Sequence, residues 1–151
     1  MAETMPVNQT MRTFGYPESV IAEYEHWAVL LRPQQATLGA LVMVCREDAT
    51  AFAAIGPAAF AEMDRVVHAV EASLARAFSY EKINYLMLMM VDPNVHFHVL
   101  PRYSGPREFA GVTFTDPGWP RLPDLGNAPA TSEPVRAALI HHLKSCWEAR
   151  S

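Results

Sequence analysis

Two histidines stand two residues apart in a segment that alternates between polar and apolar side chains. His96 and His98 occupy even-numbered positions, and the apolar residues Val95, Phe97 and Val99 occupy the odd-numbered positions around them. Successive side chains of a β-strand point to opposite faces, so the pattern predicts a strand over 94–101 whose histidines share a face. Near neutral pH one imidazole can attack as a free base while its neighbour holds or delivers a proton. Attack on phosphorus would give a covalent phosphohistidine-type intermediate.

The same spacing has two other interpretations. The histidines fit the exposed face of an amphipathic strand without any chemical role, and paired imidazoles also suit zinc or iron. A metal site needs further ligands, and no HExxH motif, CxxC motif or compact Asp/Glu cluster supplies them. The spacing alone therefore leaves a metal site as an open alternative. With its apolar side against a helix, the strand is expected to leave its polar side open to solvent or to a ligand.

The segments that must position this strand predict an α+β domain with a mostly antiparallel sheet. Apolar runs over 27–31 and 38–45 predict two strands joined by a hairpin connection at 32–35, and 82–90 predicts another strand. After Pro57, large apolar residues recur at three- and four-residue steps, which predicts one long packed helix of about 20 residues. Residues 18–24 are expected to form a short helical turn.

The whole chain, 1–151, is expected to form a single domain. Residues 1–17 have no clear period and are predicted to form an irregular N-terminal arm. The region 101–134 holds seven of the twelve prolines, so 104–131 is predicted to be a Pro/Gly-rich loop. A C-terminal helix is expected over 132–149, where a helix-start signal precedes spaced apolar residues.

Composition excludes several classes of function. The formal net charge of −4 argues against binding of a nucleic-acid polymer, which would usually require a basic surplus. The longest apolar runs fall far short of the roughly 20 residues that span a bilayer, so we expect no membrane association. The N-terminus resembles no signal peptide and the two cysteines form no metal-type pair, so we expect reduced thiols and a cytoplasmic location.

The segment 94–102 resembles the signature of the histidine triad (HIT) superfamily, His-φ-His-φ-His-φ-φ with φ apolar. Its ending, His98-Val99-Leu100-Pro101-Arg102, is similar to the fragile-histidine-triad branch of dinucleoside polyphosphate hydrolases. The likeness extends over the order of elements from about residue 27 to 103. It implies a HIT-like fold, a homodimer and a nucleotide or nucleotide conjugate as ligand. The family has no obligatory catalytic metal, so we expect no metal and no other cofactor.

The resemblance also assigns roles to residues. His96 matches the middle histidine, which attacks the α-phosphorus, and His98 matches the third, which contacts phosphate and helps the leaving group. Asn94 stands where the first histidine is expected, and it can donate hydrogen bonds but cannot carry a proton. In the family a backbone carbonyl orients the other ring nitrogen of the nucleophile, and this carbonyl is independent of the side chain at position 94.

Other positions depart from the pattern of the family. Leu38-Gly39 replaces a Gly-His pair, and the short 90–93 segment leaves no room for the Gly-Gln-Ser/Thr element that relatives use around the phosphates. The expected ribose-binding acid or amide near Leu31 is absent, which leaves Arg32, Gln34 and Gln35 as polar candidates.

Two further features have open interpretations. Arg102 can hold a phosphate through its planar fork of donors or pair with a carboxylate at a subunit contact. Met87, Met89 and Met90 can form an adaptable wall for a nucleobase or fill the core.

The sequence thus predicts cleavage at the α-phosphate of a dinucleoside polyphosphate or nucleotide conjugate through a His96-nucleotidyl intermediate. His98 is expected to assist, and Asn94, Arg102, Arg32 and Gln35 to contact the substrate. The alternative is a divergent nucleotide-binding module of the same fold with little or no turnover. The substitution at position 94 and the missing phosphate-side groups motivate that alternative.

Overall fold

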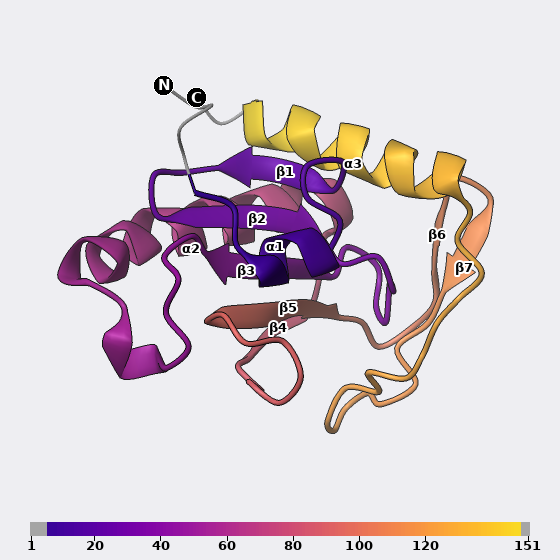
Figure 1. Cartoon of the computed structure of the whole chain (residues 1–151). Helices are drawn as coiled ribbons and strands as arrows, with labels where there is room; N and C mark the ends of the chain where they lie inside the picture. The colour runs from indigo at the N-terminus through magenta and orange to yellow at the C-terminus, as the bar shows by residue number, and fades with distance from the viewer. Residues whose placement is uncertain (1–5, 149–151) are drawn as a thin grey trace.

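A five-stranded antiparallel sheet with the strand order β1-β2-β3-β5-β4 forms the centre of the computed structural model (Figure 1). The structure describes residues 6–148. The strands span Val20–Glu23 (β1), Trp27–Leu31 (β2), Leu41–Cys45 (β3), Lys82–Leu86 (β4) and His96–Arg102 (β5). The α+β class and the mostly antiparallel sheet are as the sequence predicts.

Two helices pack together on one face of the sheet. Helix α2 spans Pro57–Phe78 and α3 spans Glu133–Glu148, and each contributes buried apolar residues to the main core. Pro57 occupies the first turn of α2, where its missing amide costs little. The indole of Trp27 donates to the Ala59 carbonyl at 2.8 Å, which fastens β2 to this helix. The predicted long helix is therefore confirmed, and it begins at Pro57 as expected.

The opposite face of β2 and β3 is covered by the N-terminal segment, whose short helix α1 spans Gln9–Thr13 (Figure 1). Asn8 caps α1 by accepting from the Met11 amide at 3.0 Å. Met11 packs against the sheet in a second apolar cluster with Ala28, Leu30, Val42 and Val44. Because both faces of β2 and β3 are covered, all ten of their residues are buried. The arm expected to be irregular therefore contains a helix and forms a third layer.

Some boundaries differ from the sequence prediction. Residues 18–24 contain strand β1 rather than a helical turn, and β4 ends at Leu86 rather than at residue 90. The third strand begins at Leu41 because residues 32–40 form a longer connection than expected, in which Gly39 has φ +85°. The predicted Pro/Gly-rich loop contains a hairpin of β6 (Arg107–Phe109) and β7 (Val112–Phe114). No helix within residues 6–148 is long and apolar enough to cross a membrane.

Candidate active site

The alternation of β5 is confirmed by the way its side chains are divided between the two faces. Val95 and Val99 belong to the core beneath α2, and Phe97 packs against it. His96 and His98 lie on the other face, beside Val44 and Val42 of β3 respectively. Their ring centroids are 5.1 Å apart with an interplanar angle of 77°. The two imidazoles are therefore close enough to act on one ligand.

The ring of His96 is oriented by its own strand. Its Nδ1 lies 2.7 Å from the backbone carbonyl oxygen of Asn94. A carbonyl oxygen can only accept, so Nδ1 carries the hydrogen. In the neutral ring this leaves Nε2 with a free lone pair. This is the orienting contact that the resemblance implies, and it does not depend on which side chain stands at position 94.

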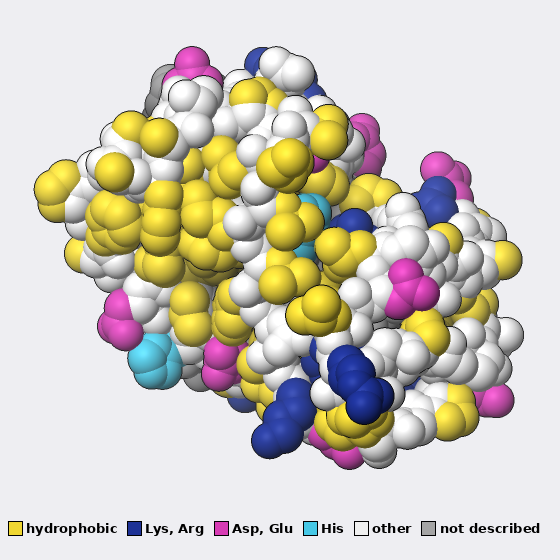
Figure 2. All heavy atoms as spheres, turned by 90° about the horizontal axis from the view of Figure 1, so that it is seen from below, with side chains coloured by type: hydrophobic (Ala, Val, Ile, Leu, Met, Phe, Trp, Pro, Cys, Tyr) yellow, Lys and Arg dark blue, Asp and Glu magenta, His cyan; other side chains and the backbone are white. Residues whose placement is uncertain are grey.

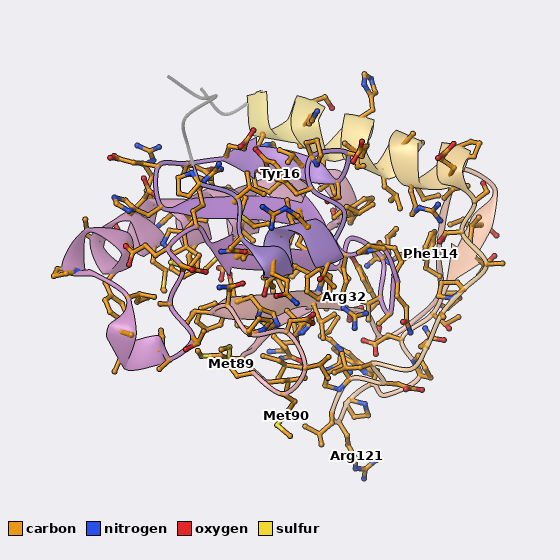
Figure 3. The ribbon with its side chains drawn as sticks, viewed as in Figure 1. Tyr16, Arg32, Met89, Met90, Phe114 and Arg121 are labelled. Carbon is orange, nitrogen blue, oxygen red and sulfur yellow. The ribbon has the colours of Figure 1, made fainter. Side chains whose placement is uncertain are left out.

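The ring of His98 has the opposite tautomer. Arg32 Nε donates to His98 Nδ1 at 3.2 Å, and because a guanidinium has no acceptor, this nitrogen must be unprotonated. Burial, followed by electrostatic interactions with Arg32 and with the His96 ring, lowers the pKa of His98 to about 4. His98 is therefore neutral at pH 7 and presents Nε2–H as a hydrogen-bond donor. Arg32, which is labelled in Figure 3, is thus brought to the histidine pair by this hydrogen bond.

The histidine face is closed rather than open, contrary to the sequence expectation. His96 is 2% exposed and His98 7% exposed. The ring of Phe14, which follows α1, lies with its centroid 5.8 Å from each imidazole. The covering layer arises because the apolar residues of the N-terminal segment bury themselves on a sheet face that is itself apolar at β2 and β3.

Asn94 anchors this cover. Its Oδ1 accepts hydrogen bonds from the backbone amide and the hydroxyl of Thr10, at 3.1 and 3.0 Å. In return, the backbone amide of Asn94 donates to Thr10 Oγ1 at 3.0 Å. Its Nδ2 donates to Asp48 at 3.1 Å. The side-chain oxygen and nitrogen of Asn94, an expected substrate contact, are thus both engaged inside the protein in this conformation.

Gln35 and Arg102, two other expected substrate contacts, are likewise engaged in hydrogen bonds within the chain. Gln35 Nε2 donates to the carbonyls of Arg32 and Ala40, both at 2.8 Å, and Oε1 accepts from the Gly39 amide, so the side chain stabilises the 32–40 connection. Arg102 lies four residues from His98. Its guanidinium donates two hydrogen bonds to the carboxylate of Asp116 in a bidentate arrangement, at 2.7 and 3.0 Å. The carboxylate partner considered for Arg102 thus comes from the same chain.

The sequence reasoning missed the residues that cover or support the site, namely Thr10, Phe14 and Asp116. Asp116 lies in the irregular region after β7, where no local pattern predicts a partner for Arg102. Of the three methionines, Met87 and Met89 pack against the core, whereas Met90 is exposed (Figure 3). Among residues 6–148 no group of three or more His, Cys, Asp or Glu side chains is arranged to hold a metal ion.

Comparison with known proteins places this arrangement in a recognised fold. No protein-family model matches the chain, and no curated protein matches its sequence. A histidine triad protein from Sinorhizobium meliloti is similar in structure, with TM-score 0.67 and 24% identity over 92% of this chain and 96% of that one. One from Bradyrhizobium japonicum has TM-score 0.70 and 19% identity over 93% and 96%.

A diadenosine triphosphate hydrolase from Plasmodium falciparum is also similar, with TM-score 0.65 and 8% identity over 89% of this chain and 79% of that one. The chain therefore has the fold of histidine triad proteins.

Proposed function

We propose that the chain is a nucleotide hydrolase or nucleotidyl transferase that cleaves at the α-phosphate of a dinucleoside polyphosphate or nucleotide conjugate. The observation that carries this proposal is the pair of neighbouring imidazoles held in opposite tautomers. His96 offers a bare Nε2 and His98 offers Nε2–H. The similarity in fold to a diadenosine triphosphate hydrolase supports the substrate class.

The proposed reaction has two displacements. His96 Nε2 attacks the α-phosphorus, a nitrogen–phosphorus bond forms, and the bond to the leaving group breaks with its electron pair. A leaving phosphate departs as the anion, and a leaving nitrogen takes up a proton from solvent and departs as the amine. Water then attacks the nucleotidyl-histidine, an oxygen–phosphorus bond forms as the nitrogen–phosphorus bond breaks, and the nucleoside monophosphate, the free imidazole and a proton to solvent are released. His98 stabilises the phosphate oxygens through its Nε2–H hydrogen bond. Because His98 is neutral at pH 7, the fixed positive charge beside it comes from Arg32.

The cover over the histidines sets a condition for this chemistry. Phe14 contacts both imidazoles, and His96 is almost fully buried. A phosphorus atom can approach His96 Nε2 only when Phe14 has moved. We therefore expect binding to displace the Phe14 side chain or the whole N-terminal segment before chemistry occurs.

Substrate turnover by wild type and His96→Ala tests the proposal. The substrates are diadenosine tri- and tetraphosphate and adenosine 5′-phosphoramidate, with mass spectrometry used to detect a nucleotidyl-protein adduct. His68→Ala is the matched control, because His68 is exposed on α2 away from the sheet face. We expect His68→Ala to behave as wild type and His96→Ala to lose turnover and adduct together. Equal turnover by wild type and His96→Ala would contradict the proposal, as would no turnover by wild type.

A binding module with little turnover is the second candidate. The closed histidine face and the structural use of Asn94 favour it. Calorimetry with adenosine monophosphate and diadenosine tetraphosphate distinguishes the two. Micromolar affinity without product formation would support the module, and the absence of binding to either ligand would count against both functions.

We further propose that two copies associate through an apolar patch on the α2 side of the sheet, formed by Phe52, Phe60, Met63, Val67 and Phe97. Phe52 and Phe60 are 43% and 41% exposed, and the Phe52 ring lies 5.5 Å from that of Phe60 and 5.8 Å from that of Phe97. Hydrophobic side chains gather broadly on the left of Figure 2. Contiguous exposed apolar surface of this kind marks interaction sites.

Light scattering with Phe60→Glu, and with Ala75→Glu as a control elsewhere on α2, tests the association. We expect a dimer for wild type and for the control, and a monomer for Phe60→Glu. A monomeric wild type would refute the association.

A further inference from the structure

A cavity of about 690 Å³ lies between β4 and the segment 119–123. Its lining includes Lys82, Asn84 and Leu86 from β4 and Trp119 and Arg121 from the segment. This volume is within the range of roughly 300–1,000 Å³ typical of small-molecule sites. None of the interactions described for the histidine pair involves these five residues.

The strand register places the lining side chains of Lys82, Asn84 and Leu86 on the histidine face, whereas those of Ile83 and Tyr85, which also line the cavity, alternate to the opposite face. Leu86 pairs with His98, and Lys82 pairs with Arg102 at the other end of β4. Residues directly opposite in an antiparallel pair point to the same side, and so do alternate residues of one strand. The cavity therefore follows the outer edge of the sheet along β4, from Leu86, the cross-strand partner of His98, to Lys82, a length of about 13 Å at roughly 3.3 Å per residue. A substrate attacked at His96 has a place beside it for its remaining part.

The charge of the lining favours an anion. Arg102 also lines the cavity, but Asp116 neutralises it. The uncompensated positive charges come from Lys82 and Arg121, both exposed, and Arg121 extends from the tip of its segment in Figure 3. The described lining contains no carboxylate side chain, although the chain as a whole has a net charge of −4. Figure 2, which views the molecule from the β4 side, shows basic side chains grouped to the lower right of the hydrophobic area.

Trp119 adds an aromatic surface to this basic cavity. Its indole is half-buried, so one part is held by the protein and another faces the cavity. Aromatic side chains stack on nucleobases whatever the base, while Lys and Arg bind phosphate oxygens. An aromatic surface beside two free cations is the combination that a nucleoside with phosphates attached requires.

We propose that this cavity is a leaving-group subsite, which holds the distal phosphates and second nucleoside of a dinucleoside polyphosphate while His96 attacks the proximal α-phosphorus. The proposal rests on the function proposed above and specifies its substrate class. Lys82 and Arg121 bind the distal phosphates, and Trp119 stacks on the second base. A substrate whose leaving group is as small as ammonia does not reach the subsite.

The test compares two substrates in a charge-removal variant. Lys82→Ala/Arg121→Ala is assayed on diadenosine tetraphosphate and on adenosine 5′-phosphoramidate, with Arg65→Ala/Lys144→Ala as the control that removes two exposed cations from α2 and α3. We expect kcat/KM for the tetraphosphate to fall about tenfold, since exposed charge pairs are individually weak. The kcat/KM for the phosphoramidate should change less than twofold. In the control variant, kcat/KM should remain that of wild type for both substrates. Trp119→Ala should lower kcat/KM for the tetraphosphate alone by about fivefold or more.

An equal fall in kcat/KM for both substrates, or no fall for either, would overturn the proposed subsite while leaving the proposed function intact. If wild type turns over neither substrate, the proposed function fails and calorimetry decides the subsite. Weaker binding of diadenosine tetraphosphate with unchanged binding of adenosine monophosphate in the double variant would then support it. Unchanged binding of both would overturn it.

Discussion

Acidification is expected to destabilise the protein through His98, the histidine held neutral chiefly by its burial. The pKa of this imidazole falls from an ordinary value of 6.5 to about 4 in the folded chain, chiefly through burial. At pH 7 the ring is neutral in both the folded and the unfolded chain, so it makes no pH-dependent contribution. Between pH 6.5 and 4 the unfolded chain takes up a proton that the folded chain does not, so stability falls as pH falls.

The size of the effect follows from the same two pKa values. Each pH unit within the window between them corresponds to about 1.4 kcal/mol. At pH 5 this single group should reduce the free energy of unfolding by about 2 kcal/mol, and at pH 4 by nearly 3 kcal/mol. That is a large part of the stability of a domain of this size.

Urea unfolding at pH 7 and pH 5 measures this contribution, with His98→Gln as the test variant. Glutamine keeps a polar side chain at this position but cannot take up a proton. We expect wild type to lose about 2 kcal/mol more than His98→Gln between the two pH values. His141→Gln, a substitution at an exposed position on α3, should retain the pH dependence of wild type. Equal losses in wild type and His98→Gln would refute the assignment of a buried, neutral His98.

Three substitutions test the contacts that shape the site. Gly39→Ala should lower the free energy of unfolding by about 2 kcal/mol or more, because φ is +85° and a new Cβ would lie 2.8 Å from the Phe78 ring. Thr10→Val removes the hydroxyl bonded to Asn94, so we expect a loss of about 1–3 kcal/mol and faster hydrogen exchange across α1. Asp116→Asn leaves a buried guanidinium without its counter-charge, at a cost of about 3–5 kcal/mol in thermal or urea unfolding.

Each of these substitutions has a matched control. Gly111→Ala has a similar φ of +79° but open space around it, so it should cost only the backbone strain. Thr13→Val, at the exposed end of α1, and Asp64→Asn, at an exposed position on α2, should leave stability nearly unchanged. A control as damaging as its partner would show that the contact described is not the cause.

The features that the sequence predicts well are those set by local periodicity. The alternation in 94–101 fixes which side chains share a face because the side-chain period of a strand is two residues. The spaced apolar residues after Pro57 likewise define α2 and its buried side. Both patterns are repeated over enough residues to outweigh single exceptions, and together they place His96 and His98 side by side.

The features that it does not predict depend on contacts between distant segments. Asn94 bonds to Thr10 across 84 positions, and Asp116 approaches Arg102 from an irregular region. A signal for the cover was nevertheless present. The apolar runs of β2 and β3 are continuous rather than alternating, which indicates strands buried on both faces. Applied to 27–31 and 41–45, this reasoning predicts a second layer over the histidine face.

The bonding between Asn94 and Thr10 has a consequence for how this sequence can change over time. Asn94 Oδ1 accepts two hydrogen bonds while Nδ2 donates a third, and a neutral imidazole offers only one acceptor and one donor. Asn94→His, which would complete the histidine triad pattern, therefore disrupts the anchor of α1 unless position 10 changes with it. The two positions are epistatic, and lineages that differ at one are expected to differ at the other.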